Sequence, residues 1–216
     1  MRKLTVLSTL VFGAVASPAF AVVYSTDFSS IASPSGGTLQ GDNSIWGVKS
    51  FSTGTPAAIW SASVGNFDYL KDGNSGYRCA GNSGHCIELG GSTGFGAGGN
   101  TPPSTVSFSL NLAPGSYAIS FDYNRQLHGP SGFDFTIGGG PATMFTVSGP
   151  LDQWLTHTQL FTATGPVTFS FITSALNQNV GSLIDNVTVV PEPGQWALML
   201  AGLGVVGLVA KRRQAK

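Results

Sequence analysis

The 216-residue sequence is poor in charge and has only two cysteines. Charged side chains make up 9% of the chain, and six of the ten basic residues lie in its first three or last six positions. Between residues 22 and 190, four basic residues accompany nine acidic ones, which leaves a net charge of about −5. Because clustered Lys and Arg are missing there, this stretch argues against nucleic-acid binding and against docking to anionic lipid.

The same stretch also lacks helical patterns. No part of it keeps a 3.6-residue apolar period for three turns, and the helix formers Glu, Lys and Arg are scarce. Apolar and polar residues instead alternate at 106–112, 117–123, 133–137 and 167–171, with Gly or Pro between the runs. Weaker patterns predict strands near 45–51, 57–62 and 86–89. Residues 22–189 are therefore predicted to form one all-β domain, an antiparallel β-sandwich.

The N-terminus has the three parts of a secretory signal peptide. Residues 1–3 are Met-Arg-Lys, residues 4–15 are mainly apolar, and Ala19-Phe20-Ala21 fits the small-x-small cleavage rule. We expect export by the general secretory route and cleavage after Ala21. The alternative is that residues 1–21 remain as an uncleaved anchor.

The C-terminal residues combine a short motif, an apolar segment and a basic tip. Pro191-Glu192-Pro193 is followed by an uncharged run at 196–210 and then by Arg212-Arg213. The run of about 15 residues is shorter than the roughly 20 that usually span a bilayer. With the two preceding residues it is still predicted to form a transmembrane helix, whose basic end stays cytoplasmic.

This order resembles the PEP-CTERM sorting signal of Gram-negative bacteria, in which a Pro-Glu-Pro motif precedes a hydrophobic helix and an arginine-rich end. The resemblance covers residues 190–216, about an eighth of the chain. It implies passage through the inner membrane and processing at or next to the motif by an exosortase, a membrane cysteine-protease-like transpeptidase. The product would be displayed or released by cells that make exopolysaccharide. The alternative is an ordinary C-terminal anchor with an incidental motif.

The two cysteines, Cys79 and Cys86, flank a turn-rich loop. In an exported protein they are expected to form a disulfide. Closing such a short loop stabilises a fold by roughly 2–3 kcal/mol in the chain-entropy model. The alternative is a metal site with His85, which lacks a fourth ligand at the usual zinc spacing.

Asp185 stands in an alternating run with Leu183, Val187 and Val189 and is therefore expected on their apolar face. An ionised carboxylate there is costly unless it is hydrogen-bonded or binds a cation. In an exported protein a hard oxygen ligand favours Ca²⁺. Asp27 stands near the start of the domain, and first and last strands often pair in sandwiches, so the two carboxylates could meet. Alternatively, Asp185 accepts hydrogen bonds from backbone N–H groups.

The opening Thr26-Asp27-Phe28 and the closing residues 183–189 resemble the jelly-roll sandwiches of galactose-binding-like and carbohydrate-binding modules. This resemblance implies a jelly-roll-like fold and a structural Ca²⁺ held first by Asp185 and second by Asp27. Aromatic side chains would stack on a bound sugar. The candidates in less regular stretches are Trp46, Trp60, Tyr69, Tyr77 and Trp154, with burial in the core as the alternative for each.

Asp122 and Asp134 form the one acid pair that we consider for glycoside hydrolysis, which uses two carboxyls around a sugar bond. Both alternate with aromatic residues, so they are expected to face solvent, and their strands could pair. The first function hypothesis is a non-enzymatic exported surface or matrix protein that binds exopolysaccharide. The second is an exported polysaccharide hydrolase, and the third is a purely structural coat protein.

Overall fold

The computed structural model describes residues 22–82, 84–91, 104–125, 131–151, 153–173, 181–192, 201–207 and 211. The chain divides into a compact body at 21–193 and a second unit made of the two ends. The predictions for residues 1–21 and for Pro193, Arg212 and Arg213 lie outside the described residues. Residues 201–207 are helical, but no helix within the described ranges is long and apolar enough to span a membrane. The transmembrane helix at 196–210 therefore stays a prediction.

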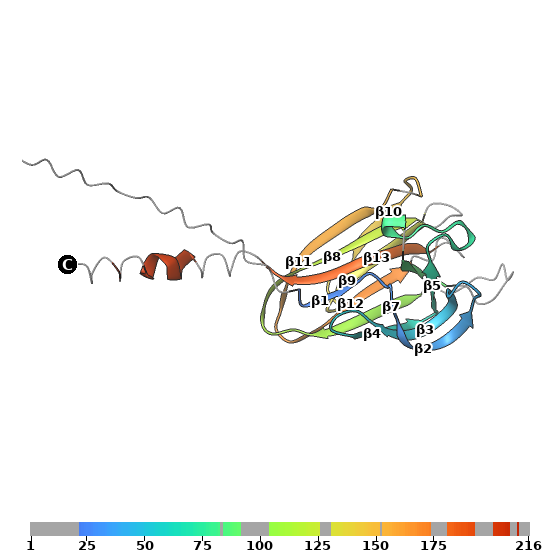
Figure 1. The fold of residues 1–216 in the computed structure, drawn as a ribbon. Helices are drawn as coiled ribbons and strands as arrows, with labels where there is room; N and C mark the ends of the chain where they lie inside the picture. The colour runs from blue at the N-terminus through green and yellow to red at the C-terminus, as the bar shows by residue number, and fades with distance from the viewer. Residues whose placement is uncertain are drawn as a thin grey trace, which may run out of the picture. The chain divides into compact units, whose positions relative to one another are not determined.

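The described part of the body contains thirteen strands in one sheet, and their pairings are antiparallel. Figure 1 shows how these strands are arranged. The first six strands are β1 (Tyr24–Thr26), β2 (Ala32–Leu39), β3 (Ile45–Thr53), β4 (Ala58–Val64), β5 (Phe67–Lys71) and β6 (His85–Leu89). The other seven are β7 (Thr105–Asn111), β8 (Gly115–Arg125), β9 (Ser131–Ile137), β10 (Thr143–Val147), β11 (Leu155–Ala163), β12 (Pro166–Thr173) and β13 (Ser182–Pro191). Two short 3₁₀ turns, η1 (Asn74–Gly76) and η2 (Ala80–Asn82), lie between β5 and β6.

The sheet curls into two layers that pack face to face (Figure 1). One layer has the order β10-β9-β12-β7-β4-β3, with β2 beside β3. The other has the order β5-β6-β13-β8-β11, with β1 beside β13. An irregular β3–β5 pairing, shifted between Ile45 and Val48, joins the layers. The predicted antiparallel, jelly-roll-like sandwich is confirmed.

Aromatic side chains fill the space between the layers. Phe121 of β8 meets Phe135 of β9 and Phe171 of β12, with ring centroids 4.9 and 5.1 Å apart. Tyr24 of β1 stacks on Phe108 of β7 at 5.1 Å. These contacts cross the core because period-two alternation sends one side chain in every pair of residues inward. The alternation seen in the sequence therefore gave the correct inward face for β7, β8, β9 and β12.

The strands that were not predicted include β2, β5 and β10, for two physical reasons. The side chains of β2 are exposed along its length, so this strand carries no inward apolar set. In β5, the first four residues are buried on both faces, which removes the alternation. The side chains of β10 are mostly exposed or half-buried. The strands expected near 45–51, 57–62 and 86–89 are present as the longer β3, β4 and β6.

Candidate functional site

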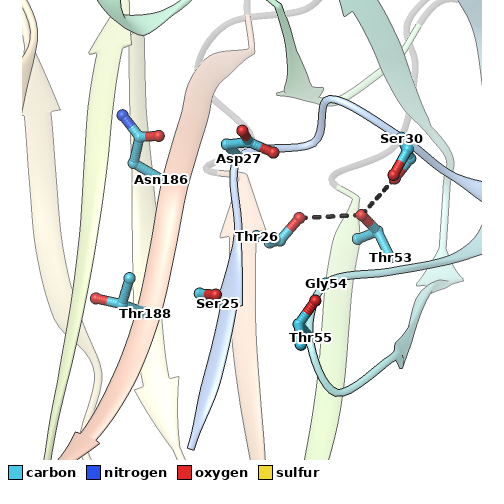
Figure 2. A pocket seen from close by; sticks show the side chains of 9 residues that line it. All are labelled: Ser25, Thr26, Asp27, Ser30, Thr53, Gly54, Thr55, Asn186 and Thr188. Carbon is cyan, nitrogen blue, oxygen red and sulfur yellow. Dashed lines mark hydrogen bonds between the residues drawn. The ribbon is translucent and has the colours of Figure 1, made fainter. Parts of the chain in front are cut away.

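A polar pocket lies where β1, the turn between β3 and β4, and β13 come together (Figure 2). Its volume is about 330 Å³, within the range of small-molecule sites. Except for one glycine, its lining residues carry hydroxyl, carboxyl or amide side chains. They are Ser25, Thr26, Asp27, Ser30, Thr53, Gly54, Thr55, Asn186 and Thr188. We refer to this hollow as the β1–β13 pocket.

Backbone pairing sets the walls of the pocket. Ser25 lies opposite Thr188 in the β1–β13 register, and Ser25 and Thr55 exchange backbone hydrogen bonds of 3.1 and 2.8 Å. Gly54 has φ +90°, and a Cβ added there would lie 2.5 Å from Cε2 of Tyr24. Only glycine lets the turn approach β1 this closely in that conformation.

Three lining residues and the neighbouring Phe28 form a directed chain of hydrogen bonds. The Phe28 N–H donates to Oγ1 of Thr26 at 3.0 Å, and Oγ1 of Thr53 donates to the Ser30 carbonyl at 2.7 Å. The two threonine hydroxyls are 3.0 Å apart. Because the Thr53 proton is already used, Thr26 is the donor between them. These two hydroxyls hold the wall together, so ligand recognition would fall to the other lining groups.

Asp27 presents a carboxylate at the pocket. Its Oδ1 accepts a 3.0 Å hydrogen bond from the Ser29 N–H, and this bond lowers the pKa of Asp27 below its ordinary value. The side chain is exposed, so its remaining acceptor positions face solvent. At neutral pH the pocket therefore holds an ionised acceptor beside several hydroxyls.

A β-bulge in β13 positions Asn186. Between Asp185 and Thr188, two residues of β13 stand opposite one residue of β8. Asn186 takes the left-handed φ of +47°, which Asn tolerates better than most residues. Its Nδ2 donates to Oδ2 of Asp122 at 2.8 Å. The bulge thus places an amide at the pocket and ties it to the neighbouring strand.

The same bulge determines on which face of the sheet Asp185 lies, and this face differs from the predicted one. Ile184, Val187 and Val189 belong to the main core, whereas Leu183 packs in a separate cluster around the disulfide. Asp185 is 2% exposed, and it contacts the disulfide loop. The expectation that it shares a face with Val187 and Val189 is wrong, because the bulge shifts the alternation by one residue.

Both carboxylate oxygens of Asp185 accept hydrogen bonds from backbone N–H groups. Its Oδ2 accepts from the Ala80 N–H at 3.1 Å, and its Oδ1 accepts from the Asn186 N–H at 2.7 Å. Burial, together with the charges of Asp27 and Asp122, raises the pKa of Asp185 to about 7 against the effect of the two hydrogen bonds. This geometry agrees with the alternative prediction, in which Asp185 accepts hydrogen bonds from backbone N–H groups.

The expected meeting of the first and last strands is confirmed, since β1 pairs with β13. Their carboxylates, Asp27 and Asp185, are near enough to interact electrostatically. Ca²⁺ needs six to eight oxygen ligands, however, and both oxygens of Asp185 face N–H donors. Within the described ranges, no group of three or more His, Cys, Asp or Glu side chains could hold a metal. The assignment of a structural calcium ion to Asp185 and Asp27 therefore stays a prediction.

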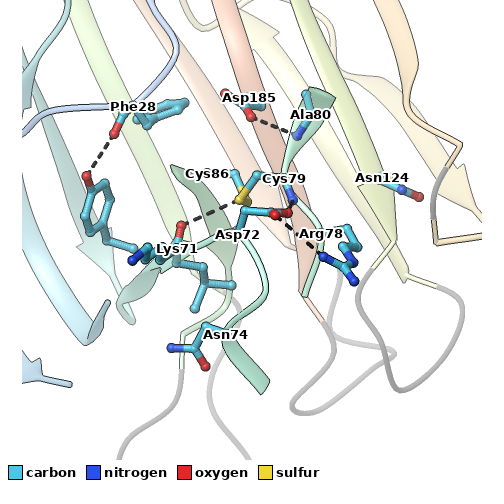
Figure 3. The surroundings of a disulfide bond; sticks show 12 residues. Phe28, Lys71, Asp72, Asn74, Arg78, Cys79, Ala80, Cys86, Asn124 and Asp185 are labelled. Atoms are coloured by element: carbon cyan, nitrogen blue, oxygen red, sulfur yellow. Dashed lines mark hydrogen bonds and ion pairs between the residues drawn. A yellow bond between two sulfur atoms is a disulfide. The ribbon is translucent and has the colours of Figure 1, made fainter. Parts of the chain in front are cut away.

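The disulfide between Cys79 and Cys86 is confirmed (Figure 3). It closes the loop that carries η2 and that donates the Ala80 N–H to Asp185. Asp72 holds the same loop, because its carboxylate accepts from the Cys79 N–H at 2.9 Å and pairs with Arg78 at 3.6 Å. The metal alternative at these cysteines is excluded by the covalent bond.

The aromatic candidates fall into two groups. Trp60 and Tyr69 are buried in the main core, as the core alternative predicted. Trp46, Tyr77 and Trp154 are partly buried and pack around the disulfide together with Leu70 and Leu183. None of these five side chains lines the β1–β13 pocket. Sequence reasoning missed that pocket because its lining groups are short polar side chains from three separate segments.

Asp122 and Asp134 do not converge. Asp122 lies on β8 between β13 and β11, whereas Asp134 lies on β9 between β12 and β10 in the other layer. The adjacent Phe121 and Phe135 meet across the core, so alternation turns the two carboxylates outward on opposite layers. The suggestion that their strands pair is wrong. Asp122 instead accepts a 2.6 Å hydrogen bond from the Thr156 hydroxyl.

Comparison with solved structures finds weak likenesses to sugar-binding proteins. A family 35 carbohydrate-binding module from Clostridium thermocellum has 15% identity and a TM-score of 0.38, covering 61% of this chain and 90% of its own. The CBM35 from Paenibacillus barcinonensis has 19% identity and a TM-score of 0.38, covering 62% and 93%. An isomalto-dextranase from Arthrobacter globiformis has 20% identity and a TM-score of 0.39. The match covers 62% of this chain and only 22% of the enzyme.

A search of curated proteins finds no match. The family model described as the PEP-CTERM protein-sorting motif matches residues 189–213. Residues 189–192 of this match also form the end of the folded body, where β13 reaches Pro191. The chain therefore carries a PEP-CTERM protein-sorting motif joined directly to an antiparallel β-sandwich.

Proposed function

We propose that this protein is exported, sorted by an exosortase, and displayed or released as a non-enzymatic surface or matrix protein that binds exopolysaccharide. The observation that carries the proposal is the sorting motif at 189–213, which continues directly from the last strand of the sandwich. In this proposal residues 1–21 are the signal peptide, 22–189 the ectodomain and 190–216 the sorting signal. The helix at 196–210 would hold the chain in the inner membrane before processing.

The chemistry of the body supports a location outside the cytoplasm and a binding role. Its two cysteines form a disulfide, a bond that persists in oxidising compartments. The separated Asp122 and Asp134 support a binding role over hydrolysis, because glycosidase carboxyls face each other across the scissile bond.

The β1–β13 pocket supports binding of a polyhydroxylated polymer. Ser25, Thr55 and Thr188 offer hydroxyls, and Asp27 offers an ionised acceptor. Sugar hydroxyls both donate and accept hydrogen bonds, and a bond to a carboxylate is roughly twice as strong as a neutral one. Since the ectodomain has a net charge of about −5, a neutral polysaccharide is favoured over an anionic one.

Affinity electrophoresis tests this function. The protein purified from its producing cells is run through gels containing the host's exopolysaccharide, with calcium and with a chelator. We expect retardation without shortening of the polymer, and a weaker effect for Asp27→Ala and Thr188→Val. Asp134→Ala, on the outer face of the other layer, is the matched control and should bind like the wild type.

The other outcomes would lead to different conclusions about the function, the binding site or calcium. A shortened polymer would favour the hydrolase hypothesis. Absence of retardation under both conditions would leave a structural coat protein. Equal loss of binding in Asp27→Ala and Asp134→Ala would show that the β1–β13 pocket is not the binding site. Retardation only in calcium would support the calcium prediction at Asp185 and Asp27.

A further inference from the structure

The sorting motif is partly folded into the sandwich. Val190 and Pro191 are residues of β13 and lie opposite Ala118 and Tyr117 of β8. The Glu192 N–H then donates to the Ser116 carbonyl at 2.9 Å, which extends the pairing by one residue. The side chains of all three motif residues are half-buried. The first half of the motif is thus part of the sheet.

The pairing of β13 with its neighbouring strands changes after Val189. Val189 is 0% exposed and is held on both sides, because it lies opposite Tyr24 of β1 and Ile119 of β8. The Val23 N–H also donates to the Val189 carbonyl at 2.9 Å. Among the described residues β1 provides no partner beyond this position. Residues 190–192 are therefore paired to β8 alone and can separate from it while Val189 stays in place.

A processing enzyme that handles the motif needs its backbone and side chains to be accessible. When opening is fast compared with cleavage, proteolysis follows the equilibrium population of the open form. A net backbone hydrogen bond contributes about 1 kcal/mol, so removing one raises that population about fivefold. The pairing with β8 is therefore strong enough to influence processing and weak enough to allow it.

We propose that the folded body keeps the first half of the sorting motif closed against β8, and that the exosortase acts on the state in which Val190–Glu192 has separated from it. The stability of this short pairing then sets the processing rate of the folded protein. This inference rests on the proposed function, because it requires processing by an exosortase.

Two variants loosen the pairing and keep the sequence from Val190 onward unchanged. Ser116→Pro keeps the carbonyl that accepts from the Glu192 N–H. It fixes φ at about −65°, whereas an antiparallel strand needs about −140°, so it distorts the start of β8 with no change in chain length. A Gly-Ser-Gly-Ser insertion between Val189 and Val190 moves the intact motif away from β8. Ser116→Ala, which keeps the backbone donor and acceptor, is the matched control.

The test is a pulse-chase of the full chain in the exporting host that contains the exosortase, with mass spectrometry of the product's C-terminus. We expect Ser116→Pro and the insertion to be processed about fivefold faster than the wild type, and Ser116→Ala at the wild-type rate. Ser116→Pro does not change the chain length. Faster processing of this variant would therefore result from release of the motif and not from a greater distance between the folded body and the membrane.

The outcomes separate this inference from the function on which it rests. If the wild type is processed and neither variant changes the rate, the inference is wrong and the sorting function stands. If the wild type is not processed in the presence of the exosortase, the proposed sorting function fails and the inference fails with it. Hydrogen exchange at the Glu192 amide provides a second measurement that does not depend on the enzyme. Exchange as fast in the wild type as in Ser116→Pro would also contradict the inference.

Discussion

At the residue scale, Asp185 combines burial with hydrogen bonds that favour its charge. Burial raises its pKa from the ordinary 3.8 to about 7, although the Asn186 and Ala80 N–H groups act in the opposite direction. The fold therefore favours the protonated carboxyl more than the unfolded chain does. Its contribution to stability is fully present below about pH 4 and is lost as the pH rises through about 7.

Asp185→Asn should flatten this part of the pH dependence. The free energy of unfolding of the wild type should fall relative to the variant between pH 4 and pH 7, by at most about 4 kcal/mol. The Asn amide cannot accept both backbone N–H bonds, which lowers the variant's stability by a roughly constant amount and leaves the slope informative. Urea denaturation at several pH values measures the difference.

Asp134→Asn, on the outer face of the other layer, is the control for this series, and its profile should follow that of the wild type. A parallel pH profile for Asp185→Asn and the wild type would show that the folded and unfolded states bind the Asp185 proton equally.

At the element scale, the disulfide loop acts as a cover over part of the β5-β6-β13 layer. Leu70 and Leu183 face this cover, and the Cys79–Cys86 bond holds its two ends together. The cover explains why β5 is buried on both faces and why Asp185 is buried away from the main core. Neither effect is visible in the alternation of a single strand.

Replacing both cysteines by serine should destabilise the body by about 2–3 kcal/mol, because the loop is short. It should also shift the fluorescence of Trp46 and Trp154, which pack against this cluster. Denaturant unfolding followed by tryptophan emission checks both effects.

Arg78→Ala is the control for this loop, since it removes only the partly exposed ion pair with Asp72. It should cost no more than about 1 kcal/mol. If the double-serine variant were as stable as Arg78→Ala, the disulfide would not be what holds the cover.

At the scale of the whole molecule, the body should fold without the sorting segment. Its core lies within residues 22–192, and a chain ending at Glu192 keeps all of β13. We expect this truncated chain to be secreted unprocessed and to melt at the same temperature as the mature protein. Cell fractionation and thermal unfolding followed by circular dichroism test both expectations.

A chain ending at Asn186 is the matched control. It loses Val187 and Val189, which are both 0% exposed, and should fail to fold. Retention of the Glu192-truncated chain in the membrane fraction would contradict the role proposed for residues 193–216. Secretion of a stable Asn186-truncated chain would contradict the core described for β13.

The β class, the disulfide and the sorting motif could all be predicted from the sequence. Each depends on local information: alternating side chains, two cysteines in an exported chain, and a contiguous motif at 189–213. The other features depend on how distant parts of the chain pack together. A single bulge moved Asp185 to the other face, curling of the sheet separated Asp122 from Asp134, and distant segments built the β1–β13 pocket. Strand order and register set such distances, and they depend on pairing between residues far apart in the chain.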